Sequence, residues 1–86
     1  MAKISYAKKR LQEWGAAVTE CNPQSIEALK GDVLIWVSIY KDSDEVSSIN
    51  VRRAGEQDDP MTDYCPGAWC NNIKGAIELA ERMATW

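Results

Sequence analysis

The most regular hydrophobic segment of the chain is residues 33–40, Val-Leu-Ile-Trp-Val-Ser-Ile-Tyr. A segment of this length, rich in β-branched and aromatic residues, is typical of a strand rather than a helix. One set of alternate positions is entirely apolar, whereas the other set mixes Leu34, Trp36, Ser38 and Tyr40. Such a strand is expected in the middle of a sheet or covered on both sides.

The next segment, residues 46–53, alternates between apolar and polar side chains, with Ile49 and Val51 on the same side. Only the short polar run 41–45 separates it from residues 33–40. Two alternating runs around a short polar loop indicate a β-hairpin. We therefore predict that 33–40 and 46–53 form an antiparallel pair.

A helical period appears near the N-terminus, over residues 3–15. Apolar side chains recur there at steps of three and four residues, while charged residues occupy the other side. The apolar positions are Ile4, Ala7, Leu11 and Trp14, followed by Val18. Gly15 is suited to end the helix, because glycine readily adopts the left-handed conformation found after helix C-termini.

The segment between this helix and the hairpin is less regular. Residues 17–21 have the composition of a short strand. The Asn22-Pro23 pair that follows resembles a helix start, since asparagine is a good N-cap and proline is tolerated at the first helical position. We therefore predict a short helix over 23–30, ended by Gly31.

The C-terminal third begins with an irregular stretch. Residues 54–66 contain two prolines and show no period, which predicts a long loop. A second helical pattern follows Gly67, and either Asn71 or Asn72 is suited to cap it. Its apolar face holds Trp69, Ile73, Ala76, Ile77, Ala80 and Ala84. This phase places Trp69 against the core.

Together these segments predict an α+β fold in one small domain, residues 1–86. We expect a small antiparallel sheet, made of the hairpin and a third short strand over 17–21, packed by an N-terminal and a C-terminal helix. The apolar content of 45% and charged content of 27% are typical of a folded globular protein. A charged N-terminus without an apolar stretch predicts no signal peptide, no membrane contact and a cytoplasmic location.

Charge is unevenly distributed, although the net charge is only −3. Four basic residues and no acid lie within the first ten positions: Lys3, Lys8, Lys9 and Arg10. The middle of the chain is acidic, with seven carboxylates between positions 42 and 63: Asp42, Asp44, Glu45, Glu56, Asp58, Asp59 and Asp63. Such a division between one end and the middle of a chain often marks a charged contact surface.

The chain contains no histidine, which removes the usual nucleophile-activating base and the commonest transition-metal ligand. Its five glycines form neither a phosphate-binding loop nor a dinucleotide fingerprint. A chain of this length also leaves little room for a sugar-binding cleft. We therefore expect a non-catalytic protein without a cofactor.

The three cysteines offer a second interpretation, a small metal-binding domain around Cys65 and Cys70. A structural zinc site needs four ligands, and the others would have to be Cys21 and a carboxylate such as Asp63. The acids of the loop are also spaced differently from a calcium loop. We therefore predict no metal site and interpret the cysteines as small core residues.

The acidic residues suggest binding to another protein. Carboxylates on a turn and a long loop can occupy the basic, nucleic-acid-binding groove of a partner, and aromatic side chains favour such interfaces. The predicted partner-binding residues are Asp42, Asp44, Glu45, Glu56, Asp58, Asp59, Asp63 and Tyr64. The alternative is a small regulator that contacts nucleic acid through the basic N-terminal helix, but an acidic chain argues against direct nucleic-acid binding.

Size, acidity and the compact plan with a long acidic loop also carry a resemblance, together with three runs of sequence. These runs are Arg52-Arg53-Ala54-Gly55, Asp63-Tyr64-Cys65-Pro66-Gly67 and Ile73-Lys74-Gly75-Ala76. The chain resembles the small proteins with which phages and plasmids block host defences, anti-CRISPR proteins above all. The resemblance implies stoichiometric binding to a host complex such as a CRISPR effector. It leaves open whether the chain also forms a homodimer.

Overall fold

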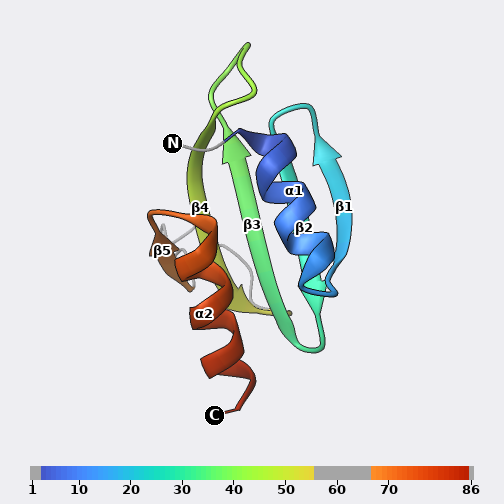
Figure 1. Cartoon of the computed structure of the whole chain (residues 1–86), viewed down its shortest axis with the longest axis vertical. Coiled ribbons are helices and arrows are strands. Elements are labelled where there is room, and N and C mark those ends of the chain that lie inside the picture. The colour runs from blue at the N-terminus through green and yellow to red at the C-terminus, as the bar shows by residue number, and fades with distance from the viewer. Residues whose placement is uncertain (1–2, 56–66, 86) are drawn as a thin grey trace.

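The computed structural model describes residues 3–55 and 67–85 of the chain. In this part, two helices pack on one antiparallel sheet of five strands (Figure 1). The elements in chain order are α1 (Ile4–Glu13), β1 (Ala17–Asn22), β2 (Ser25–Lys30), β3 (Val33–Ile39), β4 (Val46–Arg53), β5 (Ala68–Cys70) and α2 (Ile73–Ala84). The predicted α+β class, with an N-terminal and a C-terminal helix on a small antiparallel sheet, is confirmed.

The order of the strands in the sheet is the same as their order in the chain, β1-β2-β3-β4-β5. The predicted strand 33–40 is therefore the central strand, β3, and it pairs with β4 as the predicted hairpin, with Ile35 opposite Val51 and Trp36 opposite Asn50. Because side chains alternate between faces, the register over Val33–Ser38 and Ser48–Arg53 places every second residue on the same side of the sheet. The register shifts between Ser38 and Ile39, which brings Val46 opposite Ile39.

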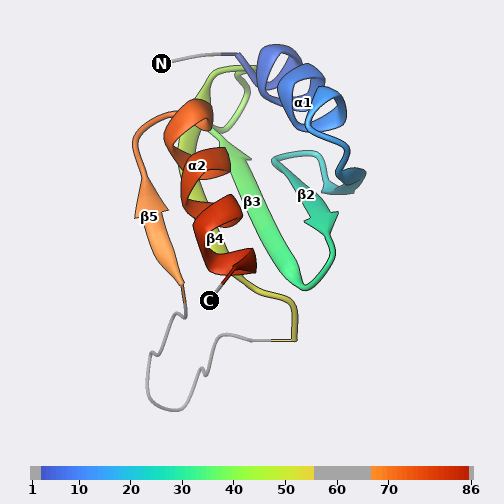
Figure 2. The same ribbon diagram turned by 60° about the horizontal axis from the view of Figure 1, so that its bottom comes forward.

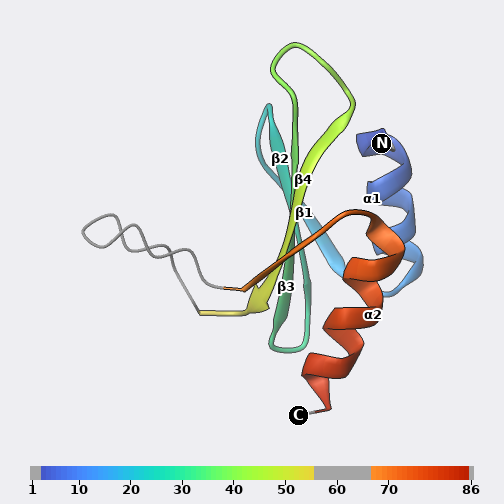
Figure 3. The same ribbon diagram turned by 90° about the vertical axis from the view of Figure 1, so that its left-hand side faces the viewer.

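Both helices lie on the same face of the sheet, which Figure 3 shows edge-on. The alternate apolar positions of the strands face the helices, and this layer forms the core. Its members are Ala7, Leu11, Ile26, Ala28, Val33, Ile35, Val37, Val46, Ile49, Val51, Ile73, Ala76, Ala80 and Met83. Burial of this apolar layer supplies the main stabilisation of the fold.

The ends of both helices follow from local sequence. Gly15 has φ 98°, and the N–H of Ala16 donates to the carbonyl of Leu11, so the chain leaves α1 through a glycine turn. Asn72 caps α2, because its side-chain oxygen accepts a hydrogen bond of 2.7 Å from the N–H of Gly75. The prediction that Asn71 or Asn72 caps the second helix is thus resolved in favour of Asn72.

Both helices of residues 3–55 and 67–85 lie on the first face, so no helix of this part covers the second face of the sheet (Figures 2 and 3). At its centre, the guanidinium of Arg52 lies 5.4 Å from the ring centre of Trp36, and Arg52 Nε donates to Asn50 Oδ1 at 2.7 Å. Arg52 is only 4% exposed and Asn50 only 2%. The two faces therefore bury different chemistry: aliphatic side chains under the helices, and a hydrogen-bonded polar pair on the other side.

The predicted helix over 23–30 is wrong, because this segment forms strand β2. Asn22 and Pro23 make a tight turn instead, in which Asn22 Oδ1 accepts a hydrogen bond from the N–H of Gln24. Side chains alternate between the two faces along β2, so Ile26 and Ala28 are buried in the core on the helix-covered face. Leu29, which a helix would have turned inward, is 43% exposed.

The prediction that Trp69 lies on the buried face of the C-terminal helix is also wrong. Trp69 belongs to β5, a short strand that the sequence did not reveal, and it is 62% exposed. It pairs with Asn50 and therefore points to the face without helices. The helix itself begins only at Ile73.

Candidate functional site

The connection between β3 and β4 projects beyond the end of the sheet (Figures 1 and 3). We call residues 40–45 the acidic turn. Two backbone hydrogen bonds close it: Tyr40 N–H donates to the carbonyl of Glu45 at 3.1 Å, and Ser43 N–H donates to the carbonyl of Tyr40 at 3.2 Å. The hydroxyl of Ser43 also accepts from the N–H of Glu45 at 3.0 Å. The turn thus has a defined shape.

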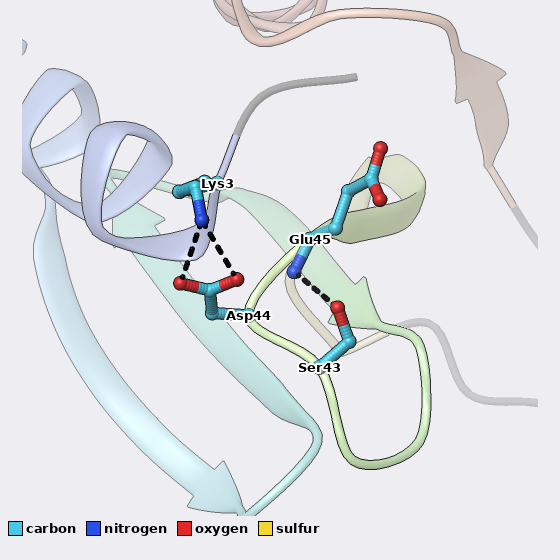
Figure 4. A network of polar contacts seen from close by, with 4 residues as sticks. All are labelled: Lys3, Ser43, Asp44 and Glu45. Carbon is cyan, nitrogen blue, oxygen red and sulfur yellow. Dashed lines mark hydrogen bonds and ion pairs between the residues drawn. The ribbon is translucent and has the colours of Figure 1, made fainter.

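The N-terminal end of α1 braces the same turn (Figure 4). The N–H of Ile4 donates to the carbonyl of Asp44 at 2.7 Å, and Lys3 Nζ lies 3.2 Å from Asp44 Oδ2. Both side chains of this ion pair are exposed, so its contribution to stability is small. Its consequence is geometric, because it joins two segments distant in sequence and orients the Asp44 carboxylate.

Most residues of the acidic turn are exposed to solvent, among them Asp42 and Tyr40. Asp42 is exposed and has φ 58°, a left-handed conformation that aspartate tolerates better than most residues. Tyr40 is 55% exposed beside it. Sequence reasoning did not identify Tyr40 as a site residue, because its position at the end of an apolar strand suggested burial. An exposed aromatic side chain next to carboxylates is a suitable anchor for a protein interface.

The turn between β1 and β2 lies at the same end of the sheet. Together the two turns line an open groove of about 860 Å³, whose walls include Asn22, Gln24, Ile39, Asp42 and Asp44. The incorrect helix prediction for 23–30 concealed this arrangement, since only the turn at Asn22 and Pro23 brings the amide side chains here. The groove offers carboxylate and amide oxygens, which accept hydrogen bonds from lysine or arginine.

The structure brings together three of the predicted partner-binding residues, Asp42, Asp44 and Glu45. All three are exposed on the acidic turn. The other five, Glu56, Asp58, Asp59, Asp63 and Tyr64, lie outside the described residues. The candidate site is therefore the acidic turn and the groove beside it.

The basic residues of α1 are partly neutralised by neighbouring acids. Besides the pair of Lys3 with Asp44, Lys8 Nζ lies 3.2 Å from Glu20 Oε1 on β1. Each ion pair reduces the local positive potential that would attract a phosphate backbone. The N-terminal helix thus presents a weaker basic patch than the sequence suggested.

The two described cysteines, Cys21 and Cys70, are far apart, and Cys65 lies outside the described residues. Cys21 is exposed, so the prediction that it is a core residue is wrong, and Cys70 is half-buried. Cys21 lies on β1 and Cys70 on β5, at opposite edges of the sheet, so three intervening strands separate them. Desolvation, together with a hydrogen bond and the negative charge of Glu27, raises the pKa of Cys21. Burial raises the pKa of Cys70, against the opposing effect of Arg82. Both thiols are therefore protonated at neutral pH and less nucleophilic than an activated cysteine.

Other features of the described residues offer little chemistry. Within residues 3–55 and 67–85, no three cysteine, aspartate or glutamate side chains gather in a way that could hold a metal ion. A more enclosed pocket of about 190 Å³ lies between α1 and the start of α2, and its lining includes Tyr6, Val46 and Ile73 but no carboxylate or thiol. Neither described helix is long and apolar enough to cross a membrane.

Comparison with known proteins finds no matching family, no similar curated sequence and no similar solved structure. The geometry of the acidic turn is therefore the basis for the functional assignment.

Proposed function

We propose that the protein is a non-catalytic inhibitor that binds a bacterial defence or other nucleic-acid-handling complex through the acidic turn. The observation that carries this proposal is the combination of exposure and bracing at the turn. Asp42 and Tyr40 face solvent, while hydrogen bonds from Ile4, Ser43 and Tyr40 hold the backbone in one shape. A site held in its binding conformation loses less conformational entropy on association.

The chemistry of the turn suggests the kind of surface it binds. Proteins that handle nucleic acid carry lysine and arginine in the groove that receives the phosphate backbone. The carboxylates of Asp42 and Asp44 can pair with such side chains, and Tyr40 can stack on a guanidinium. Because the groove beside the turn is open and carries the carboxylates of Asp42 and Asp44, it can also admit one long basic side chain.

The proposal is tested with the double variant Asp42→Asn/Asp44→Asn. Asparagine keeps the size of aspartate and tolerates the left-handed conformation at position 42, so only the charge is removed. The complex is recovered on the immobilised protein from nuclease-treated bacterial lysate and identified by mass spectrometry. We expect the double variant to recover at least tenfold less of that complex, and added salt to weaken the wild-type interaction.

Asp32→Asn is the matched control. Asp32 is also an exposed aspartate, but it lies in the β2–β3 turn at the opposite end of the sheet. This variant should recover the complex as the wild-type protein does. Equal recovery by the double variant, with an unchanged circular dichroism spectrum, would contradict the proposal. Loss of the complex on nuclease treatment of the wild-type sample would instead show that nucleic acid mediates the contact.

A further inference from the structure

The outer edge of β1 has no role in the proposed function, and no described strand pairs with it. β1 pairs with β2 on one side only, and α1 lies over β2 without covering the outer side of β1 (Figure 1). Within residues 17–20 the strand contains no lysine, proline or bulge, features that commonly protect edge strands from pairing with another chain; its irregularity lies at the far end, between Glu20 and Asn22. Its one charged side chain, Glu20, is already paired with Lys8. The edge is therefore available for a further strand.

The hydrogen bonds of the sheet show which backbone groups point in which direction. In an antiparallel sheet the N–H and C=O of one residue point to the same neighbouring strand, and this direction alternates along the chain. Ile39 N–H donates to the carbonyl of Gln24, and Ala54 N–H donates to the carbonyl of Asp32. Both bonds indicate the same alternation. The backbone N–H and C=O groups of even-numbered residues of β2 point toward β3, and those of odd-numbered residues point toward β1.

This alternation carries over to β1 through the observed register. Thr19 lies opposite Glu27, an odd-numbered residue of β2, so Thr19 directs its backbone groups toward β2. Its neighbours Val18 and Glu20 lie opposite even-numbered residues and direct their N–H and C=O groups away from the sheet. Two residues of β1, one on either side of Thr19, thus carry outward donors and acceptors.

We propose that β1 pairs with β1 of a second copy of this chain, antiparallel and centred on Thr19. In this register Val18 of each copy lies opposite Glu20 of the other, and every outward group of the two residues has a partner. A register centred on Val18 would place Glu20 opposite Ala16, whose N–H is already bonded to Leu11. A register centred on Glu20 would place two carboxylates opposite each other. The edge is self-complementary in only the first of these registers.

The resulting dimer has one continuous sheet that runs through both copies, with the helices of both copies on the same face. The pairing is isologous, as in most protein dimers, because a two-fold axis through Thr19 relates the copies. Since the contact consists of a short strand, the association should depend on protein concentration.

Disulfide trapping tests both the pairing and its register. In this register Ala17 lies opposite Cys21 of the other copy. Within one chain these positions are about 13 Å apart along the strand, which is beyond the reach of about 7 Å between the Cα atoms of a disulfide. We expect Ala17→Cys to form a covalent dimer under mild oxidation, seen on a non-reducing gel. Alkaline buffer is needed because the pKa of Cys21 is raised.

The double variant Ala17→Cys/Cys21→Ser is the control and should stay monomeric on the same gel. A dimer that forms equally well without Cys21 would show that another pair of thiols is linked and would overturn the register. The absence of a covalent dimer in Ala17→Cys, with its thiols accessible to a labelling reagent, would overturn the pairing itself.

A second test removes one outward donor. Glu20→Pro lacks the outward N–H, and proline is tolerated on an edge strand where that group faces solvent. Sedimentation analysis should show that wild-type protein and Glu20→Ala approach twice the chain mass as concentration rises, whereas Glu20→Pro stays monomeric with an unchanged circular dichroism spectrum. A wild-type protein that remains monomeric up to about 1 mM would overturn the proposal.

Discussion

The two faces of the sheet are stabilised in different ways, although the same strands form both. On the helix-covered face, Val33, Ile35 and Val37 of β3 are at most 1% exposed and contact other aliphatic side chains. On the second face the most deeply buried side chains of β4 are Asn50 and Arg52, which are joined by a hydrogen bond. The first face gains its stability from apolar area, and the second depends on particular partners.

This difference makes the faces sensitive to different substitutions. Apolar packing is lost roughly in proportion to the volume removed, because each methylene makes many weak contacts. A buried hydrogen-bonded group is destabilised by a single substitution, because removal of its partner leaves the group desolvated and unpaired.

The largest effect is expected at the centre of the helix-covered face. Ile35→Ala should lower the free energy of unfolding by about 2–5 kcal/mol, since it removes a fully buried side chain and leaves a cavity. Urea denaturation followed by circular dichroism measures this loss. Leu34→Ala, its half-buried neighbour on the second face, is the control and should cost less. An equal loss for Leu34→Ala would mean that both faces carry similar apolar stabilisation.

The next effect concerns Gly67, whose backbone lies very close to atoms of β4. Its φ is 91°, and a Cβ atom there would collide with the carbonyl oxygen of Val51 and lie 2.8 Å from Arg52 Cβ. Gly67→Ala should therefore lower the free energy of unfolding by about 2–3 kcal/mol. Gly31→Ala is the matched control, because φ is 63° but the space beside it is empty; its cost should be about 1 kcal/mol. Thermal unfolding of both variants would separate the two contributions, and similar losses would show that sterics at Gly67 matter little.

The smallest of the three effects concerns the polar pair. Asn50→Ala removes the acceptor that lies 2.7 Å from Arg52 Nε. The expected loss is about 1–3 kcal/mol, the usual cost of depriving a buried group of one partner. Ser48→Ala, a half-buried residue on the same strand and face, should change the stability little. If urea denaturation gives the same midpoint for both variants, the second face does not depend on this hydrogen bond.

The hairpin of β3 and β4 was predictable from sequence because its alternation is long and uninterrupted. The segment 23–30 was not, since Glu27, Ala28, Leu29 and Lys30 are all good helix formers. Eight residues cannot form a stable isolated helix, and pairing along β3 satisfies their backbone groups instead. Tertiary context thus overrides local preference. β5 is only three residues long, and its position depends on a register with β4 that no local pattern specifies.

The candidate site was only partly predictable. The carboxylates of the acidic turn follow from composition and from the hairpin prediction. The exposure of Tyr40 and the contact of Lys3 with Asp44 depend on how α1 docks against the end of the sheet, which a sequence pattern does not specify. The groove could be predicted only with the turn at Asn22 in its correct place, and the incorrect helix prediction for 23–30 removed that turn.

The order of the strands has a consequence for how the protein folds. Because each strand pairs with its neighbour in the chain, most of the sheet forms through short loops whose closure costs little entropy, a topology associated with rapid folding. The contact of Lys3 with Asp44 is different, since these residues are 41 positions apart. The acidic turn therefore acquires its final bracing only when α1 docks on the completed hairpin, so a partially folded chain displays the same charges without the fixed geometry that recognition requires.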